Sequence, residues 1–120
     1  MIMRFAIAAM LFTLLGACAG APTSEVVPDQ ASMASDGRDI AEAQCAACHA
    51  VGPYGDSPNA NAPVFRTLLT RYRADVLEEE LIAGIQVAHP MPEFQFNPQG
   101  ADALIAYLQS IQQSPPAPAP

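Results

Sequence analysis

The stretch Cys45-Ala46-Ala47-Cys48-His49 has the pattern C-x-x-C-H, which is the attachment signature of a c-type haem. Two thiols three positions apart lie on nearly the same face of one helical turn, so both can bond to the two vinyl groups of one porphyrin. The imidazole of His49 suits the iron on the near side of the ring. The sequence therefore predicts one covalent haem c, held through Cys45 and Cys48, with His49 as proximal iron ligand.

Other uses of a C-x-x-C pair fit this chain poorly. A thiol-disulfide enzyme is expected beside a β-α-β pattern, and no segment shows the alternation of a strand. A zinc site would have to combine Cys45, Cys48, His49 and His89. The adjacent Cys48 and His49 are poorly placed to converge on one small ion, so haem remains the favoured interpretation.

The far side of the ring needs a second ligand, and Met91 is the predicted one. A soft thioether suits iron there, and the other methionines precede the expected domain: Met1, Met3, Met10 and Met33. Met91 lies between Pro90 and Pro92, whose fixed φ angles should stiffen its loop. His89 is the competitor. Ligation by two histidines would lower the reduction potential, because imidazole is a stronger donor than a thioether.

Residues 1–17 are predicted to be a signal peptide. Arg4 is the only charge in this segment, and residues 5–15 are almost wholly apolar. A membrane-spanning helix would need roughly 20 apolar residues, so the run is too short to cross a bilayer. An oxidising, exported location follows from this interpretation.

Cys18 is predicted to carry a lipid. The preceding Leu15-Gly16-Ala17 resembles the lipobox of bacterial lipoproteins, in which the cysteine becomes the lipidated first residue. Simple cleavage after Ala19 or Ala21 is the alternative, because small residues flank both positions. The haem uses the other two cysteines, and lipidation would explain an odd thiol in an exported chain.

The rest of the chain divides by composition. Residues 18–35 are rich in Pro, Ser, Ala and acidic residues and are predicted to be a flexible tether. Residues 114–120 hold four prolines and are predicted to be a disordered or polyproline-like tail. The remaining domain, 36–113, is near the size at which a protein core alone is marginal, so a large apolar cofactor would stabilise it.

The first half of that domain predicts two helices. One covers about residues 36–47, is capped by Ser35 or Asp36, and brings the haem cysteines to its C-terminal end. After a loop rich in Gly, Pro and Asn, Pro63 opens a short second helix. One face of that helix carries Phe65, Leu68, Leu69 and Tyr72.

The second half predicts two more helices. The pattern Asp75-x-x-Glu78 resembles a capping box ahead of an apolar series that ends at Ile85. Asn97 and Pro98 form an N-cap and first-turn pair for a terminal helix ending at Ile111. Its apolar face carries Leu104, Tyr107, Leu108 and Ile111. The predicted class is therefore all-α.

The charge of the chain restricts its partners. The net charge is −7, and all five basic residues are arginines. Nucleic acids and anionic membranes need basic patches, so neither is expected as a partner. A redox partner with a positively charged docking face is expected instead, although a merely soluble acidic surface would have the same composition.

Several motifs together resemble one family, the small bacterial class I cytochromes c, over about residues 36–111. They are Gly37 to Cys48 with His49-Ala50-Val51-Gly52 after it, Ala62-Pro63-x-Phe65, and His89-Pro90-Met91-Pro92-x-Phe94. The resemblance implies a bundle of about four helices around one covalent haem. It implies thioether bonds at Cys45 and Cys48, proximal His49 and distal Met91.

The resemblance also implies contacts around these ligands. The carbonyl of Pro63 would accept a hydrogen bond from the second nitrogen of His49. The first and last helices would cross at Gly37 and Tyr107, with Leu104 beside them. Relatives often have an aromatic residue where this chain has Ala41, so the crossing is expected to be looser or shifted.

A six-coordinate iron leaves no open position for a substrate, so the expected function is electron transfer rather than catalysis. The expected protein is a monohaem carrier that serves exported or membrane-bound redox partners, is periplasmic and is anchored through Cys18. The alternatives are a haem sensor or peroxidase-like enzyme with a labile Met91, and a non-catalytic anchoring subunit. The haem propionates could be partnered by Arg66, Tyr72 and Arg73, which could equally be ordinary surface residues.

Overall fold

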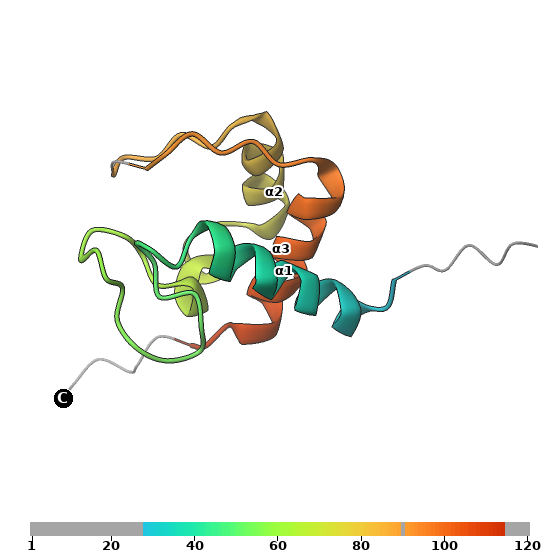
Figure 1. Cartoon of the computed structure of the whole chain (residues 1–120), viewed down its shortest axis with the longest axis horizontal. Helices are drawn as coiled ribbons and strands as arrows, with labels where there is room; N and C mark the ends of the chain where they lie inside the picture. Colours follow the sequence, from blue (N-terminus) through green and yellow to red (C-terminus); the bar gives the residue numbers. More distant parts are fainter. Residues whose placement is uncertain (1–27, 90, 115–120) are drawn as a thin grey trace, which may run out of the picture.

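The computed structural model describes residues 28–89 and 91–114, and every regular element in that part of the chain is a helix (Figure 1). The elements are, in order, α1 (Gln30–Gln44), the 3₁₀ helix η1 (Phe65–Thr70), α2 (Ala74–Ala83) and α3 (Pro98–Ile111). The predicted all-α class is confirmed. The predicted signal peptide, Cys18 and nearly all of the predicted tail lie outside the described residues.

Helix α1 begins earlier than the sequence predicted. The side chain of Asp29 accepts a hydrogen bond from the backbone N–H of Ser32 at 2.9 Å and so caps a helix that starts at Gln30. The predicted cap at Ser35 or Asp36 is therefore wrong, and residues 30–35 of the predicted tether are helical. Aspartate and serine are both good caps, and the exposed first turns of the helix lack the apolar spacing that would have distinguished the three positions.

Helices α1 and α3 cross at Gly37. A Cβ atom on Gly37 would overlap the backbone carbonyl of Ala103 and would lie 2.8 Å from the Cβ of Tyr107. Only glycine allows this approach. Ala41, where relatives often have an aromatic residue, is fully buried in the same core as Leu104, and whether the crossing is looser or shifted relative to theirs stays a prediction.

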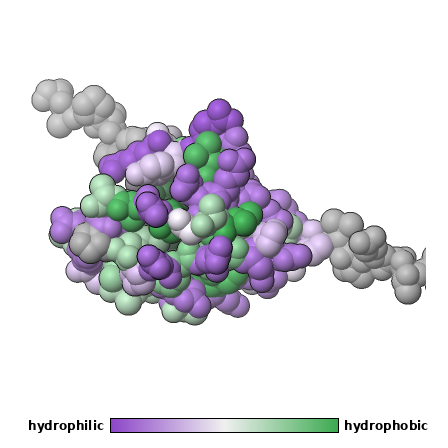
Figure 2. All heavy atoms as spheres, turned by 90° about the horizontal axis from the view of Figure 1, so that it is seen from above, coloured by the Kyte–Doolittle hydropathy of each residue, from purple (hydrophilic) through white to green (hydrophobic). Residues whose placement is uncertain are grey.

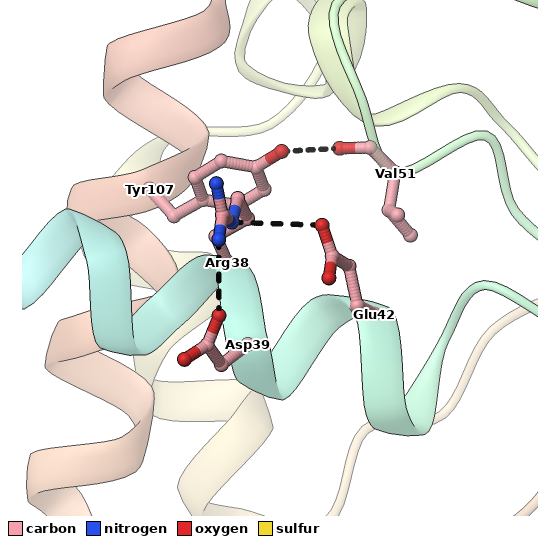
Figure 3. A network of polar contacts seen from close by, with 5 residues as sticks. All are labelled: Arg38, Asp39, Glu42, Val51 and Tyr107. Carbon is pink, nitrogen blue, oxygen red and sulfur yellow. Dashed lines mark hydrogen bonds and ion pairs between the residues drawn. The ribbon is translucent and has the colours of Figure 1, made fainter.

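The Tyr107 side chain fastens this crossing to the loop that follows the cysteine motif. Its hydroxyl donates a hydrogen bond to the carbonyl oxygen of Val51 at 2.9 Å (Figure 3). Burial raises the pKa of Tyr107, so the hydroxyl stays protonated and remains a donor. The nearby ion pairs of Arg38 with Asp39 and Glu42 are largely exposed and contribute little stability.

Helix α2 does not begin with the predicted capping box. Its N-cap is Arg73, and Asp75 lies inside the first turn, where an acidic side chain is favourable beside the positive end of the helix dipole. The Asp75 carboxylate accepts a hydrogen bond from Arg73 Nε at 3.1 Å, and this bond lowers the pKa of Asp75. Gly84 ends the helix with a φ of 101°, so Ile85 lies beyond it.

The other two helices, η1 and α3, lie closer to the positions predicted from the sequence. The predicted helix after Pro63 is the short η1, whose Phe65 and Leu68 are buried, whereas Tyr72 lies past its end and is exposed. Helix α3 begins as predicted, with the Asn97 side chain accepting from the Gly100 N–H at 2.8 Å and Pro98 in the first turn. Its buried face is the centre of the core.

Gln112, just after α3, clamps that helix to η1. Its side-chain oxygen accepts from the Leu69 N–H, and its side-chain nitrogen donates to the carbonyls of Phe65 and Leu108, each at 2.9 Å. The neighbouring Gln113 donates from its backbone to the carbonyl of Arg66 at 2.8 Å. We call these bonds of Gln112 and Gln113 the glutamine clamp.

In the described part of the chain, the segment 84–97, which connects α2 to α3, is held to the rest of the domain by fewer hydrogen bonds than the end of α3 is. It runs out from the end of α2 and returns to the start of α3 (Figure 1). Among the described residues, its backbone is held to the preceding helix by a hydrogen bond from the Phe96 N–H to the Leu81 carbonyl at 3.0 Å. The rings of Phe94 and Phe96 stack with centres 6.1 Å apart on its returning half.

Candidate haem site

A cavity of about 220 Å³ lies between the end of α1, the 3₁₀ helix η1, helices α2 and α3, and the segment 84–97. Its walls are mainly apolar, with Phe65, Leu81, Leu104 and Leu108 among them. All predicted site residues within the described part of the chain line it: Cys45, Cys48, His49, Pro63 and Met91, together with the competitor His89. Figure 2 shows hydrophobic side chains in the middle of the face seen from above, with hydrophilic ones around them.

The cysteine motif lies in a turn that continues directly from α1. The helix ends at Gln44 rather than at the predicted Ala47, and Cys45 is its C-cap. The N–H of Cys48 and the N–H of His49 both donate to the carbonyl of Cys45, at 3.1 and 2.9 Å. The turn therefore keeps the two thiols and the imidazole at one end of the cavity.

Both thiols of the motif are free, with Cys45 half-buried and Cys48 exposed. Burial raises the pKa of the Cys45 thiol to about 11, so this thiol is protonated at neutral pH. Thiol-disulfide enzymes need the opposite shift, because the thiolate is their nucleophile. Cys45 therefore lacks the lowered pKa of a disulfide-exchange nucleophile.

The imidazole of His49 is oriented by Pro63. Its Nδ1 lies 2.7 Å from the carbonyl oxygen of Pro63, which is the contact that the family resemblance implied. A carbonyl can only accept, so Nδ1 carries the proton and Nε2 keeps its lone pair. The ring also packs against Phe65, with centres 5.1 Å apart. His49 is thus held in the tautomer that a metal ligand requires.

The segment 84–97 brings His89 and Met91 to the same cavity as His49. Met91 lines the cavity and is partly buried. The ring centre of His89 lies 5.7 Å from that of His49. Pro90 lies outside the described residues, so the predicted stiffening of the Met91 loop by its two prolines stays a prediction.

These donors fit a haem better than a bare metal ion. Within residues 28–89 and 91–114, no three His, Cys, Asp or Glu side chains are grouped as a metal site would require. The cavity instead combines mainly apolar walls with the two thiols of the motif, the imidazoles of His49 and His89, and the thioether of Met91. A large apolar ring with a central iron needs this combination.

The cytochrome c family model matches residues 34–112, which is well over half of the chain. The chain belongs to the cytochrome c family. Members bind haem c covalently, and Cys45 and Cys48 have the spacing of the family's attachment motif. The chain matches no curated protein and no solved structure.

The three residues predicted as possible partners of the haem propionates have different positions relative to the cavity. Tyr72 lines the cavity, but Arg66 and Arg73 do not. Arg66 donates to the carbonyl of Gly55, and Arg73 pairs with Asp75 on an exposed surface. The geometry therefore leaves Tyr72 as a candidate and gives the two arginines other partners.

Several residues that line the cavity of this cytochrome c were not predicted from the sequence as site residues. Leu77 and Leu81 of α2 line the cavity, and Phe94 and Phe96 cover it from the segment 84–97. The alternation of Phe94 and Phe96 with polar neighbours was the available signal, since alternate residues of an extended chain share one face. In the described part of the chain, no helix has the length and apolar character needed to cross a membrane.

Proposed function

We propose that this cytochrome c is a monohaem carrier that passes one electron between exported or membrane-bound redox partners. Family members are typically haem-based electron carriers. The observation that carries the proposal is that His49 and Met91 line the same cavity from different segments. Ligation by both would leave no iron position open, which favours electron transfer over catalysis.

The proposed roles follow from the chemistry of the donors. Cys45 and Cys48 hold the haem covalently, His49 is the proximal ligand and Met91 the distal one. The bound haem supplies an iron that alternates between ferric and ferrous states. The Pro63 carbonyl fixes the His49 ring and raises its basicity. The thioether of Met91 favours ferrous iron, so these two residues tune the potential in opposite directions.

Optical spectroscopy of the ferric protein tests Met91 ligation. We expect a far-red sulfur-to-iron charge-transfer band and slow, saturating binding of cyanide, because the thioether must leave before cyanide can enter. The band should disappear on reduction, which is the internal control. A high-spin ferric spectrum with fast binding proportional to cyanide concentration would instead favour a haem sensor or a peroxidase-like enzyme.

The proposed partner is a redox protein with a basic docking face. The net charge of −7 and the absence of lysine support this choice and disfavour nucleic acid. Asp75, Glu79 and Glu80 are exposed on α2, the helix whose Leu77 and Leu81 line the cavity. Glu79 and Glu80 therefore supply exposed negative charge on a helix that borders the cavity, whereas the charge of Asp75 is paired with that of Arg73.

The proposed location is the periplasm of a bacterium, with Cys18 lipidated after removal of residues 1–17. The N-terminal sequence supports this, and cytochrome c domains are typically found outside the cytoplasm. Intact mass spectrometry of the native protein should give a chain starting at Cys18, plus one haem and a lipid. The variant Cys18→Ala should lose the lipid but keep the haem. A native chain starting after Ala19 or Ala21 would contradict the anchor.

A further inference from the structure

His89 has an unusual position for a residue without an assigned role. It lines the cavity beside Met91, and its ring lies edge-on to that of His49 with an interplanar angle of 69°. Its Nε2 atom is buried and has no hydrogen-bond partner among the described residues. A buried nitrogen without a partner is unfavourable, so a ligand for this atom is expected in the cavity.

The separation of the two rings is close to what a shared metal would impose. A bond from a metal to an imidazole nitrogen is about 2 Å long, so two imidazoles on opposite sides of one ion have ring centres about 6 Å apart. The observed separation of His49 and His89 is 5.7 Å. The separation of the two rings therefore matches the one that binding to the same iron requires.

No other nitrogen donor of this kind is available. The chain has no lysine, and His49 and His89 are its two histidines. Met91 follows His89 by two residues, so one short segment carries both a thioether and an imidazole into the cavity. The two side chains therefore offer alternative ligands for one position.

We propose that His89 is a reserve iron ligand, which occupies the distal position whenever the thioether of Met91 does not. The inference rests on the proposed distal role of Met91. The exchange would replace an iron–sulfur bond by an iron–nitrogen bond to Nε2 of His89, with no electron transferred. Both ligation states leave the iron closed to small molecules, so loss of Met91 ligation lowers the potential without creating an open, peroxidase-like site.

The test compares three variants as haem-loaded proteins: Met91→Leu, which keeps the side-chain volume, His89→Gln, and the two combined. We expect ferric Met91→Leu to lose the far-red band, remain low-spin with the electron paramagnetic resonance spectrum of two imidazoles, and have a lower reduction potential. The combined variant should be high-spin and bind cyanide at least about tenfold faster than Met91→Leu. His89→Gln alone should keep the far-red band. Circular dichroism confirms that each variant retains its helices.

Two outcomes overturn the inference in distinguishable ways. If the native protein shows the far-red band but Met91→Leu is high-spin and binds cyanide as fast as the combined variant, His89 is not a reserve ligand and the proposed role of Met91 stands. If the native protein lacks the band and His89→Gln alone becomes high-spin, His89 is the resident ligand. That result would overturn both the reserve role and the proposed Met91 ligation.

Discussion

Replacing Gly37 with alanine is expected to lower the free energy of unfolding of the haem-loaded protein by about 2–3 kcal/mol, which is the upper part of the usual range for overpacking a tight contact. The added Cβ would overlap the carbonyl of Ala103, and backbone atoms cannot move aside as a flexible side chain can. Helices α1 and α3 would have to separate. The measurement is denaturant unfolding followed by circular dichroism.

The sign of this effect is informative because helix propensity acts in the opposite direction. Alanine in a helix interior is more favourable than glycine by about 1 kcal/mol. The matched control is Gly52→Ala, where an added Cβ would meet no atom within 4 Å and φ is not positive. We expect the control to be close to neutral. An equally stable or stabilised Gly37→Ala protein would show that the helices do not cross this closely.

The second large effect is expected for Leu108→Ala, which should cost about 3 kcal/mol of stability through lost burial and the cavity left behind. Leu108 is 1% exposed and is the largest fully buried side chain of the described residues. It also lines the haem cavity, so its loss should loosen packing on one side of the haem. Thermal unfolding of the haem-loaded protein would measure the lost burial and the loosened packing against the haem together.

Val76→Ala is the control for Leu108→Ala. Val76 is 45% exposed on α2, so removing its methyl groups should change stability by no more than about 0.5 kcal/mol. If Leu108→Ala were as mild as this control, the core would have to collapse around the missing side chain. The haem absorption spectrum would then be expected to shift, because Leu108 and the haem would share that space.

The predictions from the sequence were most accurate where a local pattern is typical of a single structure. The C-x-x-C-H motif placed His49, and Asn97 with Pro98 placed the start of α3, because capping is a contact between neighbours in the chain. The family resemblance added the Pro63 contact with His49, which joins residues far apart in the sequence. No periodicity of apolar residues could have supplied that contact.

The wrong predictions of where α1 and α2 begin concern positions at which several nearby residues could cap a helix. Asp29, Ser35 and Asp36 can all cap a helix, and the exposed early turns of α1 gave no apolar pattern to choose between them. Asp75 resembled a cap but is a first-turn acid whose carboxylate binds Arg73. The bonds of Gln112 to Leu69 and Phe65 were not foreseen, because a polar residue near the chain end carries no signal of a partner so distant.

The glutamine clamp gives the cavity two unlike walls. On one side, several hydrogen bonds of Gln112 and Gln113 join α3 to η1 and restrain the distance between these two elements. On the other side, the segment that carries His89 and Met91 is joined to α2 by a backbone bond at Phe96. Among the described residues, the wall formed by α3 and η1 is therefore held by more hydrogen bonds than the segment that carries His89 and Met91, so we expect this segment to move more when the shape of the cavity changes.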